Sequence, residues 1–307
     1  MRKITLAILV LAFAMSAFGQ TPTLRIVTDD PNLPSDLFYG SSRVTPLRLR
    51  PGTNTPITID DSDFFVFEQY VDFLSRMPDQ AGQDYWTSQL TSCSPQPSCL
   101  DRRRVEVSTA FFIEQEYQAT GYFVYKLYRG VLGRYSTYAE FKPDRRQIVG
   151  GAQLLDSKKA FAAAFIQRPE FQSKYPASLS TAAQFVDAVL ATVQTTTGAD
   201  LSASRLSLIS AFGDAADGGR ARVIREVADN AALSTREYNR GFVAIQYWGY
   251  LQRDYDQGGY DFWLNALNNS SNNQSGMVCS FITAAEYQLR FGTNVTRTNA
   301  LCQQLYP

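Results

Sequence analysis

Two pairs of aspartates are the residues of this 307-residue chain that come nearest to a recognisable chemistry. Asp79 and Asp84 lie five positions apart, and Asp256 and Asp261 repeat that spacing. Two carboxyl groups suffice for a glycoside hydrolase, in which one serves as general acid and the other as base or nucleophile. The structural interpretation, which we favour, is that Asp79 and Asp256 cap helices and the other two are exposed acids in the first helical turns.

A calcium site at the same two turns is a further alternative. Carboxylate and backbone oxygens suit this hard cation, although the spacing of an EF-hand loop is absent. The chain has no histidine, which excludes Ser-His-Asp and Cys-His nucleophiles and most zinc hydrolase sites. No phosphate-binding glycine loop or Rossmann fingerprint occurs. The sequence therefore predicts no enzyme, no catalytic residue, no metal site and no cofactor.

Aromatic side chains near these turns are candidates for ligand binding, because exposed rings stack on sugars or anchor a partner. Most aromatic residues follow helical apolar stripes and are expected in the core. Tyr255 and Tyr260, which lie beside a turn, are expected at the surface. The candidate binding residues are Asp79, Gly82, Trp86, Asp256, Gly259, Trp263, Tyr255 and Tyr260.

Four cysteines allow three disulfide connectivities. Sequence proximity favours Cys93–Cys99, across a short Ser-Pro-Gln-Pro-Ser loop, and Cys279–Cys302, which would tether the C-terminal tail. Zinc is disfavoured, since no CxxC spacing is present.

The N-terminal residues have the features of a secretory signal peptide. Arg2 and Lys3 precede an apolar run from Ile4 to Ala14, and small residues flank a cleavage position at Gly19. Residues 1–19 are therefore predicted to be removed, and the mature chain is expected outside the cytoplasm, secreted or periplasmic, without a membrane span. Equal numbers of acidic and basic residues argue against a nucleic-acid partner. The only basic cluster, Arg102 to Arg104, is interpreted as a solvated helix face.

An internal repeat organises the rest of the chain. Residues 20–60 form a Pro-rich extended arm, after which four units each open with Phe-Val and close with Glu followed by an aromatic residue. The opening phenylalanines are Phe65, Phe123, Phe185 and Phe242, and the closing glutamates are Glu116, Glu170, Glu237 and Glu286. We expect units one and two within residues 61–178, units three and four within residues 179–292, and a disulfide-tethered tail at residues 293–307.

The periodicity within a unit is helical. Val278, Phe281, Ile282 and Ala285 occupy positions i, i+3, i+4 and i+7, one face of a helix. Each unit is thus predicted to form a helix, a polar turn, a second helix and a third. Such units cannot bury their aromatic faces alone, so neighbours must stack. The predicted fold class is an all-α protein of helical repeats.

The opening of unit one resembles a widespread bacterial domain family of unknown function. The residues that carry this resemblance are Phe65, Val66, Tyr70, Leu74, Arg76, Pro78, Asp79, Gly82, Tyr85 and Trp86. The family is similar in motif to the phycobilisome linker domain, and residues 237–291 resemble the C-terminal part of exported acidobacterial proteins. The resemblance implies a helical fold without established enzymatic activity. Residues 253–263 align without gaps to residues 76–86, whereas units two and three depart from the Pro-Asp-x-x-Gly pattern.

These observations predict an exported, non-enzymatic binding or scaffold module at the cell exterior. A cell-surface protein or a polysaccharide is the expected partner. The alternatives are a glycan-active hydrolase that uses paired carboxylates and a calcium-ordered surface-layer or matrix component.

Overall fold

The computed structural model describes residues 57–93, 97–213, 216–270, 273–292 and 294–306, together with the backbone of short strands between residues 23 and 57. The predicted signal peptide lies outside the described residues. Within the predicted arm, β1 (Thr23–Arg25), β2 (Asp36–Tyr39) and β3 (Ser42–Val44) form an antiparallel sheet, and β4 (Arg48–Leu49) pairs with β5 (Pro56–Ile57).

The remainder of the described chain is helical, so the predicted all-α class is confirmed. The helices of the first two predicted units are α1 (Ser62–Gln69), η1 (Tyr70–Leu74), α2 (Gln80–Thr91), α3 (Pro97–Ile113), α4 (Gln115–Ala119), α5 (Gly121–Lys126), η2 (Leu127–Leu132), α6 (Tyr138–Arg146), η3 (Gly151–Gln153), α7 (Leu154–Phe165) and α8 (Pro169–Lys174).

The second half of the chain continues in the same manner. Its helices are α9 (Ala182–Thr197), η4 (Ser202–Ser204), α10 (Arg205–Phe212), α11 (Ala216–Ala228), α12 (Ala231–Gln246), η5 (Tyr247–Leu251), α13 (Gln257–Asn269), α14 (Asn273–Ile282), α15 (Ala285–Gln288) and α16 (Asn299–Leu305).

The opening helix changes from α to π geometry in three of the four predicted units. The π-helical segments η1, η2 and η5 follow α1, α5 and α12, and each is followed by a left-handed residue, namely Ser75, Gly133 and Gln252. Unit three differs, because α9 stays α-helical until the left-handed Gly198. The left-handed residue reverses the chain, so that the next helix packs back against the first.

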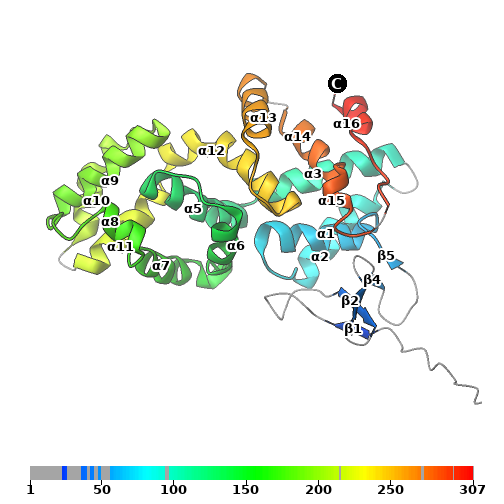
Figure 1. Ribbon diagram of the computed structural model, residues 1–307, viewed down its shortest axis with the longest axis horizontal. Coiled ribbons are helices and arrows are strands. Elements are labelled where there is room, and N and C mark those ends of the chain that lie inside the picture. Colours follow the sequence, from blue (N-terminus) through cyan, green and yellow to red (C-terminus); the bar gives the residue numbers. More distant parts are fainter. Residues whose placement is uncertain are drawn as a thin grey trace, which may run out of the picture.

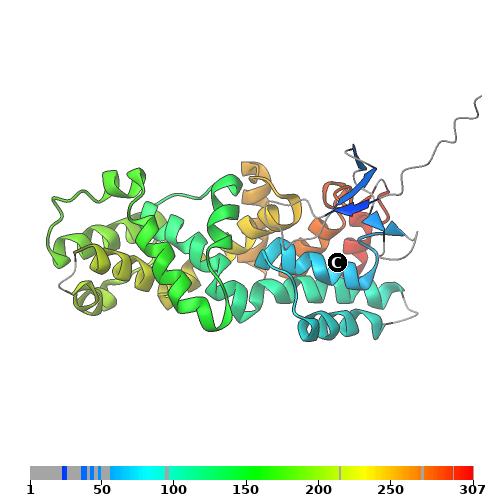
Figure 2. The same cartoon turned by 90° about the horizontal axis from the view of Figure 1, so that it is seen from below.

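The two outer units of the chain pack on each other, and so do the two middle units. Figures 1 and 2 show an elongated molecule, with α1 to α3 beside α13 to α16 at one end and α5 to α11 at the other. Unit one lies against unit four, where Phe73 contacts Tyr250 (ring centroids 4.9 Å apart) and Arg290 pairs with Asp72 at 2.7 Å. Unit two lies against unit three through η2, α9 and α11. Because α12 spans the middle, it connects these two halves (Figure 1).

Aromatic residues dominate the core, as their helical spacing predicts. The largest fully buried side chains include Tyr117, Tyr122, Tyr125, Tyr128, Tyr175, Tyr250 and Tyr287. Two expectations are wrong. Ala285 does not continue the buried face of Val278, because α14 ends at Ile282 and Ala285 is exposed. Arg104 is not part of a solvated face: it is 2% exposed and donates to the carboxylate of Asp101.

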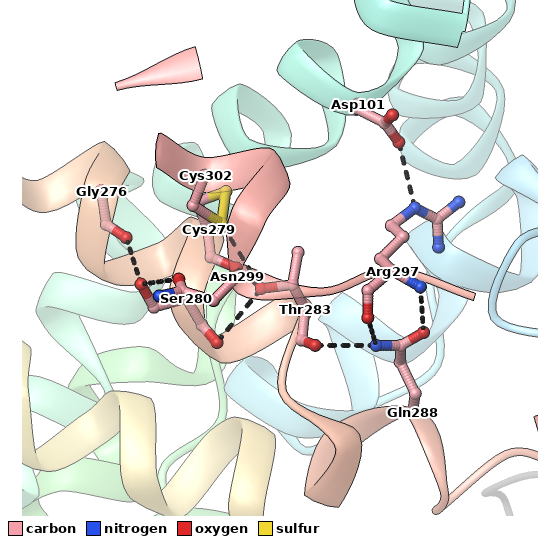
Figure 3. The surroundings of a disulfide bond; sticks show 9 residues. All are labelled: Asp101, Gly276, Cys279, Ser280, Thr283, Gln288, Arg297, Asn299 and Cys302. Atoms are coloured by element: carbon pink, nitrogen blue, oxygen red, sulfur yellow. Dashed lines mark hydrogen bonds and ion pairs between the residues drawn. A yellow bond between two sulfur atoms is a disulfide. The ribbon is translucent and has the colours of Figure 1, made fainter. Parts of the chain in front are cut away.

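The structure brings both predicted cysteine pairs to disulfide-bonding distance. The Cα atoms of Cys93 and Cys99 are 5.5 Å apart, and those of Cys279 and Cys302 are 5.6 Å apart. Figure 3 shows the second bond joining α14 to the tail. There Arg297 donates to Asp101 on α3, at 3.0 Å. The tail is therefore held to both unit four and unit one.

Candidate binding site

The two predicted N-caps are confirmed. An oxygen of Asp79 accepts from the backbone N–H of Gly82 at 2.8 Å, and Asp256 accepts from Gly259 at 2.7 Å. The hydrogen bond from Gly82 lowers the pKa of Asp79. Both carboxylates thus satisfy amide groups that the first helical turn leaves without partners.

The glycine of the same turn lies close to a tyrosine of the preceding helix. A Cβ atom on Gly82 would lie 2.2 Å from the hydroxyl of Tyr70, and one on Gly259 would lie 2.2 Å from that of Tyr247. In unit one, the indole of Trp86 packs against the ring of Phe111, which in turn packs edge-on against Tyr70. The glycine of the shared Asp-x-x-Gly pattern therefore provides room for a tyrosine hydroxyl.

The arginine before each cap binds the closing glutamate of its own unit, a link that we did not infer from the sequence. Arg76 donates two hydrogen bonds of 2.7 Å to Glu116, and its guanidinium lies 4.9 Å from the ring centre of Tyr70. Arg253 repeats the arrangement with Glu286, at 2.7 and 3.2 Å. Each forked pair fixes the short closing helix of its unit, α4 or α15, against the turn.

Unit two achieves the same arrangement with different residues. Arg134 binds the closing Glu170 and also Glu140, which caps α6 together with Thr137. Asp144 stands where unit one has tryptophan and accepts a hydrogen bond of 2.7 Å from the hydroxyl of Tyr128. In unit two, the tyrosine hydroxyl therefore has a carboxylate as its partner.

Unit three has Thr196 where the other units have this arginine, and Arg129 of unit two replaces it. Its guanidinium donates to Glu237, the closing glutamate of unit three, at 3.0 Å and to the carbonyl of Thr196 at 2.8 Å. Glu237 has no exposed surface, and the hydroxyl of Tyr125 donates to it at 2.7 Å. An arginine from a neighbouring unit therefore neutralises a glutamate that its own unit leaves unpaired.

The expectation that Tyr260 lies at the surface is wrong. It is 3% exposed, and its hydroxyl lies 2.8 Å from that of Tyr135. Tyr255 is partly buried against the same rings. The exposed aromatic residues are instead Tyr85 and Phe262, at 57% and 64%, which directly precede the partly buried tryptophans of α2 and α13. The candidate residues thus mainly build the turns and the core.

The remaining acids of the two aspartate pairs are exposed on their helices. Asp84 accepts from Gln80 and Asp261 accepts from Gln257, both at 2.8 Å. Within the described part of the chain, no three Cys, Asp or Glu side chains gather closely enough to share a metal ion.

A groove of about 650 Å³ lies where α12 meets α4, α5 and α13. We call it the α12 groove. Its lining is mainly polar and aromatic, and includes Gln118, Tyr122, Arg236, Tyr238, Asn239 and Arg240. Asn239 and Asn268 also line an adjoining hollow of about 350 Å³ that reaches α14.

Hydrogen bonds between helices hold the walls of the α12 groove. Asn239 on α12 donates to Asn268 on α13 at 2.9 Å, and Tyr122 on α5 donates to the carbonyl of Ser234 at 2.6 Å. The ring of Tyr238 packs edge-on against Phe112. Sequence reasoning missed this groove, because its walls come from helices of different predicted units and no single repeat contains its pattern.

No described helix is both long and apolar enough to cross a membrane. Residues 230–291 match the model of a family described as a domain of unknown function, DUF4214. This match supports the predicted resemblance to a family of unknown function over unit four and the end of unit three. No curated protein matches the chain, and neither does any solved structure.

Proposed function

We propose that this chain is an exported, non-enzymatic binding module that holds an extracellular polysaccharide in the α12 groove. The observation that carries the proposal is the lining of that groove. Amide side chains such as Asn239 and Asn268 offer donors and acceptors for hydroxyl groups, and Tyr238 offers an aromatic edge. Open, polar and continuous with a second hollow, the groove suits a hydroxyl-rich polymer better than a small apolar ligand.

Export is the part of the proposal that comes from the sequence. The signal-like residues 1–19 motivate it, and two disulfides are compatible with an oxidising destination. A secreted or periplasmic location, in turn, makes a cell-surface or matrix polysaccharide an accessible ligand. The neighbouring repeats would hold the groove in place and would have no catalytic role.

A panel of neutral and acidic polysaccharides tests binding directly. Thr235, an exposed residue of the groove, is changed to tryptophan to fill it. Leu206 on α10, which is 76% exposed and outside the groove, receives the same substitution as a matched control. We expect Thr235→Trp to abolish binding without changing the melting temperature and Leu206→Trp to change neither. Equal binding by both variants would contradict the proposed site.

The two alternatives give different results with the same material. A hydrolase would release reducing ends from the polysaccharide, and Asp79→Asn or Asp84→Asn would stop that release. A calcium-ordered matrix component would melt at a higher temperature when calcium is added.

A further inference from the structure

The α12 groove carries a positive charge that its lining does not neutralise. Arg236 and Arg240 line it, and none of the described lining residues is acidic. Arg236 donates through Nε to the carbonyl of Thr197 at 3.0 Å, a bond that leaves its charge unpaired. Arg240 has only long contacts, 3.7 Å to Glu237 and 3.4 Å to the carbonyl of Arg236. Both guanidinium groups can therefore donate hydrogen bonds to an anionic ligand.

A third cation, Lys126, lies directly behind the groove. Its side chain is 4% exposed. The ammonium donates to the hydroxyl of Ser234 at 2.7 Å and lies 4.7 Å from the ring centre of Tyr122, and these two residues line the groove. Within the described chain, no carboxylate is in ion-pair contact with this ammonium. A buried charge of this kind is costly unless something compensates it.

The other charged groups around Lys126 do not supply that compensation. Asp229 is the nearby acid, but it is paired with Lys158 at 2.7 Å. Glu237 lies close to Tyr122, but it is paired with Arg129. Once these pairs are counted as neutral, the ammonium of Lys126 and the guanidinium groups of Arg236 and Arg240 remain. Consistently, burial lowers the pKa of Lys126 to about 8.

We propose that the α12 groove selects an acidic polysaccharide, whose uronate carboxylates bind Arg236 and Arg240 in front of the buried ammonium of Lys126. This inference rests on the proposed function and names the ligand class. Amide side chains along the groove would bind the sugar hydroxyls. A neutral polysaccharide would bind more weakly, because it brings no carboxylate to pair with the three cations. Screening by salt should weaken the binding, because the arginines are partly exposed.

Isothermal titration calorimetry with an α-1,4-linked galacturonate hexamer tests the charge assignment, with the neutral galactose hexamer of the same linkage and hexaglutamate as comparisons. We expect only the galacturonate hexamer to bind well. Arg236→Gln and Arg240→Gln should each weaken it about tenfold, the typical effect of losing a charged hydrogen bond. Arg205→Gln, which removes an exposed pair with Asp187 on a distant helix, should have no effect.

Lys126→Met provides a readout that a purely structural role would not give. Because a bound carboxylate stabilises the charged ammonium, binding should raise the pKa of Lys126, and wild-type affinity should fall between pH 7 and pH 9.5. Lys126→Met should bind more weakly at pH 7 and show no such fall. Nuclear magnetic resonance of the lysine side chain measures the shift of its pKa on binding.

The outcomes separate this inference from the proposed function. Equal affinity for the neutral and charged hexamers would overturn the charge assignment and leave polysaccharide binding in place. Tighter binding of hexaglutamate would overturn the polysaccharide class. Failure of every glycan, neutral or acidic, would overturn the proposed function itself.

Discussion

At the scale of single residues, an arginine binds the closing glutamate of every predicted unit, and this arginine comes either from the same unit or from a neighbouring one. Arg76, Arg134 and Arg253 each bind the closing glutamate of their own unit and lie over a tyrosine. Arg129 does the same for Glu237 from a neighbouring unit, with its guanidinium 4.1 Å from the ring centre of Tyr135. The interaction survives the loss of the local arginine because a planar guanidinium from another direction can satisfy the same carboxylate.

Glu237→Gln should therefore be strongly destabilising. It leaves the buried charge of Arg129 without its counterion, which typically costs about 3–5 kcal/mol. Glu116→Gln, which disrupts the more exposed pair with Arg76, should cost about 1 kcal/mol or less. Urea unfolding of the two variants measures the difference. An equal loss of stability in both variants would show that the buried pair of Arg129 and Glu237 contributes no more to stability than the more exposed pair of Arg76 and Glu116.

Asp79 and Asp256 should behave as helix caps when they are changed. Replacement by alanine should cost about 0.5–2 kcal/mol, and replacement by asparagine should cost less because the amide oxygen still caps. Melting curves with added calcium and with chelator are the measurement. Equal damage from alanine and asparagine, together with a calcium-dependent wild type, would favour the calcium alternative instead.

At the scale of elements, the turn after the first helix places the cap and the arginine. In units one and two, the backbone N–H of the arginine donates back to the carbonyl of the tyrosine in the π-helical segment, from Arg76 to Tyr70 at 3.4 Å and from Arg134 to Tyr128 at 3.2 Å. The left-handed residue between them makes this reversal. Two of these residues, Ser75 and Gln252, carry a side chain at positive φ.

Ser75→Gly and Gln252→Gly should stabilise the protein by about 0.5–1 kcal/mol each. A left-handed conformation costs a residue with a Cβ atom roughly 1–2 kcal/mol, which glycine avoids. Glycine also loses more conformational entropy on folding, and this loss offsets only part of the stabilisation. Ser92→Gly is the matched control, because Ser92 ends α2 with φ near −60°. Thermal unfolding should show no gain for Ser92→Gly. A loss at Ser75 would mean that its side chain contributes more than the strain costs.

The tail is the second element whose stability can be tested. Replacing Cys279 and Cys302 by serine should cost about 3 kcal/mol, because this disulfide closes the longer loop. Replacing Cys93 and Cys99 should cost about 2 kcal/mol by the same loop-length argument. Denaturant unfolding gives both values. A greater loss from the 93–99 replacement would show that loop length does not decide the order.

At the scale of the whole molecule, the first unit of the chain packs on the last, and the two middle units pack on each other. Unit one packs on unit four, and unit two on unit three, while α12 joins the halves and carries most of the groove. The ring of Phe73 lies close to the backbone of Gly249, where a Cβ atom would be 3.0 Å from it. The contacts between helices thus link residues of the expected segment 61–178 to residues of the expected segment 179–292.

A fragment of residues 57–178 should consequently fail to fold alone, because it lacks the partner surfaces of both its units. We expect weak helical circular dichroism, and recovery of native ellipticity when residues 179–307 are added. Circular dichroism and proteolysis of the separate and mixed fragments test this. Cooperative unfolding of the isolated fragment would contradict the role assigned to these contacts.

Much of the architecture follows from the sequence by itself. Helical periodicity determines the all-α class, and an aspartate followed three positions later by glycine determines the caps at Asp79 and Asp256, since both signals act within a few residues of chain. Proximity alone favours the two cysteine pairs found at bonding distance. These features are local, so the spacing of residue types is enough to specify them.

Only the tertiary structure decided which units meet and what their junction makes. The sequence does not indicate that Arg129 neutralises Glu237, that Tyr260 is buried against Tyr135, or that Lys126 lies behind a groove. Each of these depends on contacts between residues more than a hundred positions apart along the chain. Repeat periodicity shows that faces must be buried, but hydrophobic burial is non-directional and does not choose the partner; shape and charge complementarity in three dimensions make that choice.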